Sequence, residues 1–152
     1  TTDIFQALGA ATAQIAFSEL YVALQQKVVD GQENPLTNIA SSKIYEVNPF
    51  ISFSAHKWEC TPVLMSKMAW SRLDAKAREI VLEAMAEATT LQITTSNEAN
   101  AKLEKDFRAN PSLTINEVDL DAFRKQTAQV FDKWEQKPFG AFVKDLRKTV
   151  LG

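Results

Sequence analysis

The chain has 152 residues, of which 45% are hydrophobic and 24% charged, and a net charge of −2. This composition is typical of a folded globular protein and excludes a disordered or collagen-like chain. No stretch approaches the roughly 20 apolar residues needed to cross a bilayer, and no clustered basic excess or polybasic run indicates binding to nucleic acid or to an anionic membrane surface. One cysteine, Cys60, and one histidine, His56, exclude an internal disulfide framework and a zinc site built from several such residues of one chain.

Catalytic patterns are equally scarce. The four glycines stand alone at positions 9, 31, 140 and 152, so no Gly-rich phosphate-binding loop exists. A nucleophile–base pair would have to combine Cys60 with His56, in a segment predicted as strand and turn where neither side chain points at the other. We interpret Cys60 as a small buried or half-buried hydrophobic residue and, from the residue alone, favour a structural role for His56. The sequence therefore favours neither an enzyme nor a metal site, and it implies no cofactor.

The first 27 residues predict a helix, a strand and a second helix. Residues 1–8 are predicted helical, with Gly9 as the C-cap. Residues 12–17 are short, apolar and partly β-branched, which indicates a strand. Ser18 is expected to cap the following helix, whose apolar side chains recur at helical spacing as far as about Lys27.

A polar elbow at residues 32–35 separates that helix from the next elements. Within it, Pro35 disfavours helical backbone at Asn34. Beyond it, the pattern predicts a short helix and then two strands, at residues 36–46, 48–56 and 61–68.

A long helix is predicted from residue 72 to residue 107, with Ser71 and Asp74 forming a weak capping box. Such a helix would be roughly 50 Å long, whereas a compact globule of this chain length is about 40 Å across. Three arrangements would remove this conflict: a kink in the Thr-rich middle of the helix, a partner chain, or a second lobe. The remaining elements are predicted as a strand and two helices, at residues 112–118, 120–136 and 141–150, and the whole order indicates an α/β fold.

Two adjacent stretches carry a specific pattern. Residues 16–26 read AFSELYVALQQ and residues 28–35 read VVDGQENP. Downstream, KIYEV at residues 43–47, the strand ending at His56, and the Trp70-x-x-Leu73 pair keep the same order and spacing. In these residues the sequence resembles the solute-binding subunits of tripartite ATP-independent periplasmic (TRAP) transporters, the DctP-type family. The resemblance covers nearly all of residues 8–107 and weakens toward the C-terminus.

The resemblance implies a two-lobed periplasmic-binding-protein-like α/β fold, with a mixed sheet flanked by helices and a long helix that spans both lobes. It implies capture of a small organic acid, usually a carboxylate, in the periplasm and delivery to membrane permease subunits, without direct membrane insertion, nucleic acid or cofactor. Family members are about twice as long as this chain, which corresponds to their C-terminal half. Residues 1–58 would belong to the second lobe, residues 59–99 would return to the first lobe, and residues 100–152 would complete the second.

The resemblance also implies a ligand site. Asn34 would hydrogen-bond the ligand and Phe17 would pack its ring against it, with Trp58 and His56 as further candidates. Each has a structural alternative: Asn34 as a turn residue, Phe17 as a hydrophobic staple at the helix entry, and Trp58 as a surface residue. The family's carboxylate-binding arginine lies upstream of the segment that matches Thr1, and no Lys or Arg precedes Lys27. We therefore expect this chain by itself to bind ligand weakly, since lysine cannot copy the bidentate arginine contact.

A function of a different class stays open at this point. A helix that overhangs its own domain would expose apolar surface, and such surface drives association. The alternative is therefore a helical interaction module that forms homo-oligomers without binding a small ligand.

Overall fold

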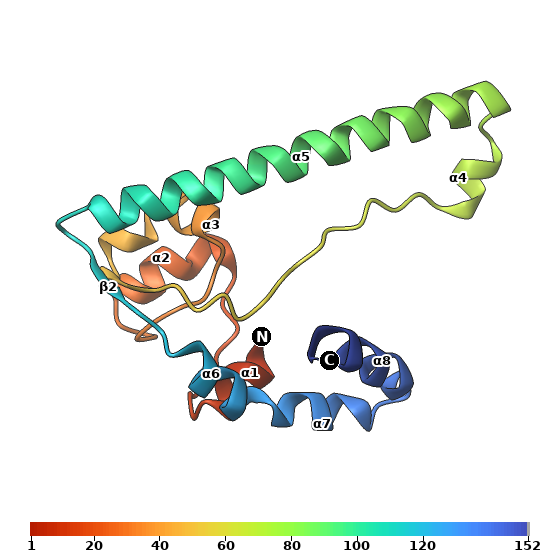
Figure 1. Cartoon of the computed structure of the whole chain (residues 1–152). Helices are drawn as coiled ribbons and strands as arrows, with labels where there is room; N and C mark the ends of the chain where they lie inside the picture. Colours follow the sequence, from red (N-terminus) through yellow and green to blue (C-terminus); the bar gives the residue numbers. More distant parts are fainter. Residues whose placement is uncertain (152) are drawn as a thin grey trace. The chain divides into compact units, whose positions relative to one another are not determined.

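The computed structural model describes residues 1–151 (Figure 1). Among them, no helix is both long enough and apolar enough to cross a membrane. The chain divides into two compact units: unit 1 comprises Thr1–Asp30, Ile51–Lys57 and Asn116–Gly152, and unit 2 comprises Gly31–Phe50 and Trp58–Ile115. In chain order the elements are α1 (Thr2–Ala7), α2 (Phe17–Gln25), α3 (Leu36–Ser41), the 3₁₀ turn η1 (Ile44–Glu46), β1 (Phe50–Ser52), α4 (Lys67–Ser71), α5 (Ala75–Ala109), β2 (Thr114–Asn116), α6 (Leu120–Thr127), α7 (Gln129–Glu135) and α8 (Gly140–Leu151).

Unit 1 joins helices from both ends of the chain. α1 packs against α6 and α7, and α7 packs against α8 (Figure 1). The side chain of Gln126 donates to the carbonyl of Ala7 at 3.0 Å, which ties α6 to the end of α1. The positive φ of Gly9, +89°, then reverses the chain just beyond that helix, a conformation that glycine adopts without steric cost. The predicted helix is confirmed, but its C-cap is Leu8, and Gly9 lies one residue beyond it.

Unit 2 is built on one end of the long helix α5. α3 packs against α5, and the buried side chains there are Ile39, Ile44 and Phe107. The rings of Tyr45 and Phe107 lie with centroids 5.6 Å apart. Near the other end of α5, the guanidinium of Arg78 lies over the ring of Trp70 in α4, 5.7 Å from its centroid.

α5 is one continuous helix of 35 residues (Figure 1), about 50 Å at the usual helical rise. Asp74 caps its start by accepting from the amide of Ala77 at 2.7 Å. In its Thr-rich middle, the hydroxyl of Thr89 donates to the carbonyl of Met85 at 2.7 Å, so this hydroxyl is satisfied within the helix. The sequence left open a kink at this place, and the helix continues through it. Its single buried residue is Phe107.

The sheet is small. β1 and β2 pair as a two-stranded sheet, with the amide of Thr114 donating to the carbonyl of Pro49 at 2.9 Å and the side chain of Asn116 donating to Ser52 Oγ at 3.1 Å. Both pairs advance in the same direction, so the strands are parallel. The longer strand predicted at residues 48–56 is cut short because the amide of Ser54 turns back to the carbonyl of Ser52 at 3.0 Å. The chain is therefore a helix-rich α/β structure, and the predicted α/β class is confirmed. The expected mixed sheet is wrong for the described residues, in which two parallel strands form the sheet.

Two predicted strands are wrong. Residues 12–17 form no strand, and Phe17 is already the first residue of α2, whose N-cap is Ala16 and not Ser18. Residues 61–66 adopt neither helix nor strand, and α4 begins at Lys67. The apolar and β-branched residues of both segments match the sequence pattern of a strand. A strand also needs a neighbouring strand that pairs with its backbone N–H and C=O groups.

Two predicted helices are interrupted. The helix expected at residues 36–46 breaks into α3 and η1 because Lys43 takes a left-handed conformation, with φ of 50°. The helix expected at residues 120–136 divides into α6 and α7 at Ala128. Just before that division, the hydroxyl of Thr127 donates to the carbonyl of Phe123 at 2.9 Å, a bond that competes with the backbone ladder and bends helices.

Candidate functional site

The elbow at residues 32–35 enters α3 in unit 2. Asn34 is half-buried, and its Nδ2 donates to Oε1 of Gln32 at 2.6 Å. Pro35 follows with φ −57° and ψ 150° as the N-cap of α3, so the backbone at the end of the elbow is extended before the helix begins. The Gln32 contact occupies one of the two Nδ2 hydrogens. Asn34 therefore keeps a capacity to donate and to accept further hydrogen bonds, and its printed contact is with a side chain and not with the backbone of a turn.

Phe17 lies in unit 1 as the first residue of α2, and 45% of its surface is exposed. The staple alternative placed it outside the helix, one residue before an N-cap at Ser18. Since Phe17 is itself helical, it does not occupy that staple position. It is therefore an exposed aromatic residue at the start of a helix.

His56 lies within unit 1 between two phenylalanines. Its ring makes an edge contact with Phe5, with centroids 5.2 Å apart, and a tilted contact with Phe123 at 6.1 Å. Its Nδ1 lies 2.7 Å from the hydroxyl of Ser54. These contacts agree with a structural role for His56, because they connect residues 51–57 with α1 and α6.

Trp58 and Cys60 lie in unit 2, in residues 58–66, which form no regular element. Trp58 is 84% exposed, and the thiol of Cys60 is free and exposed. The prediction that Cys60 is buried or half-buried is wrong, because that prediction assumed that the segment packs as a strand. Among the described residues, no group of three or more His, Cys, Asp or Glu side chains is arranged to hold a metal ion.

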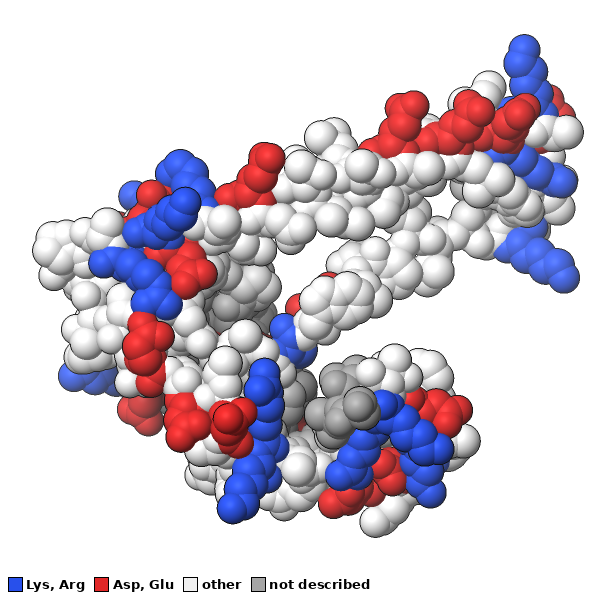
Figure 2. Space-filling view, in the orientation of Figure 1, with Lys and Arg blue, Asp and Glu red and all other residues white. Residues whose placement is uncertain are grey.

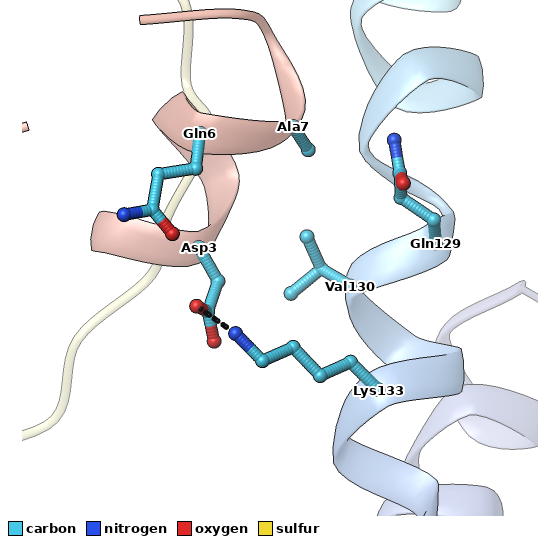
Figure 3. A pocket seen from close by; sticks show the side chains of 6 residues that line it. All are labelled: Asp3, Gln6, Ala7, Gln129, Val130 and Lys133. Atoms are coloured by element: carbon cyan, nitrogen blue, oxygen red, sulfur yellow. Dashed lines mark hydrogen bonds and ion pairs between the residues drawn. The ribbon is translucent and has the colours of Figure 1, made fainter. Parts of the chain in front are cut away.

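A polar groove lies within unit 1 between α1 and α7 (Figure 3). It has a volume of about 240 Å³, and the residues that line it are Asp3, Gln6, Ala7, Gln129, Val130 and Lys133. None of the four candidate residues lines it. The carboxylate of Asp3 accepts from Lys133 Nζ at 2.5 Å, and its other oxygen accepts from Trp134 Nε1 at 2.8 Å. The groove therefore lies where the bonds of Asp3 to Lys133 and Trp134 join α1 to α7.

The charged groups that join α1, α7 and α8 stabilise one another. The hydrogen bond from Lys133, followed by that from Trp134, lowers the pKa of Asp3 below its ordinary value of 3.8. Nearby, Arg147 of α8 donates to Asp132 at 2.7 Å and to Glu135 at 3.0 Å, and these bonds raise the pKa of its guanidinium. Sequence reasoning missed both clusters, because Asp3 and Lys133 are 130 residues apart and neither belongs to a recognisable motif.

The lowered pKa of Asp3 predicts acid sensitivity. A carboxyl whose folded pKa is depressed contributes stability above its unfolded pKa and loses that contribution as pH falls through the folded value. We expect Asp3→Asn to lower the free energy of unfolding at pH 7. The difference between variant and wild type should shrink as the pH falls below about 4, because Asp3 then becomes protonated in the wild type. Urea denaturation monitored by circular dichroism from pH 7 to pH 2.5 measures it. Asp145→Asn, at an exposed contact of 4.0 Å with Lys148, is the control, and an equal gap there would contradict the prediction.

Charge on the long helix is arranged in a stripe. Along the first half of α5, acidic side chains recur every four residues, at Glu79, Glu83 and Glu87, and Figure 2 shows this row of red side chains along that helix. Spacing of four residues places them on one face. The three glutamates are exposed, and negative side chains of this kind repel a carboxylate ligand.

Solved structures with this fold are periplasmic solute-binding proteins. A TRAP periplasmic solute-binding protein from Sulfitobacter sp. NAS-14.1, solved with bound α-D-taluronate, matches with a TM-score of 0.83 and 28% identity, over 96% of this chain and 48% of that one. The apo ectoine-binding protein TeaA of the TeaABC TRAP transporter matches with a TM-score of 0.81 and 27% identity, over 99% of this chain and 51% of that one.

Sequence comparison gives the family. The chain belongs to the bacterial extracellular solute-binding proteins, family 7 (DctP), whose model matches residues 1–137. The uncharacterized protein y4mM of Sinorhizobium fredii is 56% identical over 87% of this chain and 24% of its own length. The C4-dicarboxylate-binding periplasmic protein DctP of Rhodobacter capsulatus is 35% identical over 86% of this chain and 37% of its own length. The chain thus spans well under half of these relatives.

Proposed function

We propose that these residues belong to the extracytoplasmic solute-binding subunit of a TRAP transporter, which captures a small organic acid in the periplasm and delivers it to membrane permease subunits. The observation that carries the proposal is the family match over residues 1–137. Relatives named for C4-dicarboxylates and for sialic acid support a carboxylate ligand, as do structural neighbours solved with taluronate and galacturonate. Because the family consists of binding proteins, we propose no catalytic step.

The ligand-binding residues of this chain are proposed to be Asn34 and Phe17, with Trp58 and His56 as secondary candidates. Asn34 supports the proposal by its chemistry: an amide N–H donates to a carboxylate oxygen, and a charge-assisted hydrogen bond is stronger than a neutral one. Phe17 offers a half-exposed ring, which suits the apolar part of an organic acid. His56 is the weakest candidate, because its ring is already packed between Phe5 and Phe123.

Residues 59–99 are proposed to return to the first lobe, while residues 1–58 and 100–152 belong to the second. Exposed apolar side chains support this division: Val63, Leu64 and Met65 are exposed in the irregular segment, and Ile80 and Leu82 are exposed on α5. Solvent exposure of these groups costs roughly 25 cal/mol per Å² relative to burial. A first lobe packed on this segment would remove that cost.

Asn34→Asp is expected to weaken binding of organic acids by at least about tenfold. The substitution places a carboxylate where the ligand carboxylate should receive a hydrogen bond, and like charges at contact are strongly unfavourable. Isothermal titration with succinate, malate and galacturonate measures the effect. Because this chain spans about half of its structural neighbours, the titration uses the full two-lobed protein. The 152-residue chain alone is expected to bind these acids weakly or not at all, and binding in the millimolar range or tighter would contradict this expectation.

The matched control is Asn110→Asp, because the side-chain oxygen at Asn110 accepts from the amide of Ser112 at 2.9 Å and aspartate preserves that bond. Asn110→Asp should leave affinity unchanged. Absence of binding across the acid panel by the two-lobed wild-type protein would contradict the proposed function. Equal affinity in Asn34→Asp and wild type would contradict the role of Asn34 alone.

Exposed apolar side chains on α5 bear on the alternative of a homo-oligomer. Four large apolar side chains on α5 are exposed, namely Ile80, Leu82, Leu91 and Ile93. They do not fall on one helical face, since residues two apart point in different directions, and this scatter is unlike the continuous seam of a coiled coil. Sedimentation equilibrium over a concentration series separates the two functions, because a strict monomer that binds organic acids supports only the first.

A further inference from the structure

The side chain of Gln32 is the partner of Asn34 in the elbow. Gln32 and Asn34 are two residues apart, and Nδ2 of Asn34 lies 2.6 Å from Oε1 of Gln32. This distance is slightly below the usual range for an N–H···O hydrogen bond, and the contact is half-buried. In this contact the nitrogen of the Asn34 amide faces the oxygen of the Gln32 amide.

The direction of that amide decides what a ligand meets. An asparagine amide has a donating end and an accepting end, which exchange places when the group rotates by half a turn. A carboxylate ligand is bound by the N–H end and repelled by the oxygen. With one Nδ2 hydrogen held by Gln32, the nitrogen is fixed on the Gln32 side, and its second hydrogen remains able to donate.

The neighbouring backbone holds the pair in place. Pro35 fixes its own φ at −57° and restricts the backbone of the residue before it, so Asn34 has few backbone conformations available. Pro35 also starts α3, where its carbonyl accepts from the amides of Asn38 at 3.0 Å and Ile39 at 3.1 Å. Because Ile39 is buried, the base of the elbow is anchored in the core of unit 2.

We propose that Gln32 is a positioning residue that fixes the amide of Asn34 with its nitrogen oriented to donate to an oxyanion ligand. Gln32 acts through Asn34, without contact to the ligand. It thereby adds specificity for acceptor groups such as carboxylates over ligands that present a donor. This inference rests on the proposed ligand role of Asn34, while the Gln32–Asn34 contact itself is testable without any ligand.

The first arm of the test is spectroscopic and uses the ligand-free chain. The side-chain Nδ2 protons of Asn34 are assigned in a ¹H–¹⁵N spectrum by their loss in Asn34→Asp. In Gln32→Met, which keeps the length of the side chain but removes the acceptor, one of the two protons should move upfield. In Gln32→Glu, which keeps an acceptor oxygen, that proton should return to a hydrogen-bonded shift. Unchanged Asn34 resonances in Gln32→Met would overturn the proposal.

The second arm measures affinity for succinate, malate and galacturonate by isothermal titration of the full two-lobed protein. Gln32→Met should bind about 3- to 10-fold more weakly, the range expected when one neutral hydrogen bond is lost. The control is Gln92→Met on α5, which loses a comparable contact, Gln92 Nε2 to Ser96 Oγ at 2.9 Å, and should bind as wild type does.

The two arms separate the inference from the function. If the wild-type protein binds no organic acid, the proposed function fails, and the spectroscopic arm alone decides whether Gln32 orients Asn34. If the wild-type protein binds and Gln32→Met binds equally well, the positioning role is overturned while the proposed function stands. An equal loss in Gln92→Met also overturns it, because the effect would then come from general destabilisation.

Discussion

Phe107→Ala is expected to lower the free energy of unfolding by about 3–5 kcal/mol, the usual cost of deleting a buried aromatic ring. Phe107 is 5% exposed, is the single buried residue of α5, and meets the ring of Tyr45. Removing it leaves a cavity where α5 joins the core of unit 2. Urea denaturation followed by circular dichroism gives the free energy.

The control for this variant is Leu91→Ala on the same helix, since Leu91 is 68% exposed. Leu91→Ala should change the free energy of unfolding by less than about 0.5 kcal/mol, as is usual for surface positions. Comparable losses in the two variants would mean that Phe107 does not anchor the helix in the way described.

Gly140→Ala is expected to cost about 3 kcal/mol and to disrupt the packing of α8 on α7. A Cβ at position 140 would lie 1.8 Å from the carbonyl oxygen of Glu135 and 2.6 Å from its carbon. Both are backbone atoms, so no side-chain rotation relieves the clash and the turn between the helices must open. Overpacking of this kind costs 1–3 kcal/mol and occasionally more.

Gly31→Ala is the matched control, because a Cβ there meets nothing closer than 3.9 Å, the side chain of Asn48. It should leave the free energy of unfolding nearly unchanged. Thermal melts of both variants, with the wild-type chain alongside, measure the difference. A Gly140→Ala variant as stable as the wild type would show that the approach of the two helices is not needed for the fold.

The helices could be predicted from the sequence more reliably than the strands. The sequence predicts the long helix at residues 72–107, and the structure has it at Ala75–Ala109, because helical periodicity and the absence of Gly and Pro are local signals. Residues 61–68 carried an equally suggestive apolar pattern, but a strand depends on a partner strand that local sequence does not specify. The residue types around Lys43 also do not predict its left-handed conformation, which divides α3 from η1.

The candidate site was predictable only in part. The elbow at residues 32–35 could be located from Pro35 and its polar neighbours, and the structure confirms an extended entry into α3. The contact between Gln32 and Asn34 is local, yet nothing in the residue types specifies that these two amides meet. The Asp3–Lys133 pair could not be predicted at all, since pairing over 130 residues depends on the complete fold.

The interleaved order of the two units has a consequence for how the protein is made. Unit 1 requires residues 1–30 and also residues from 116 onward. Asp3 of α1 therefore cannot form its contact with Lys133 until α7 has been synthesised. Contacts between such distant residues form slowly, because a long loop must close before they form. Neither unit is a continuous stretch of polypeptide, so unit 1 can be completed only after the residues of unit 2 have been synthesised.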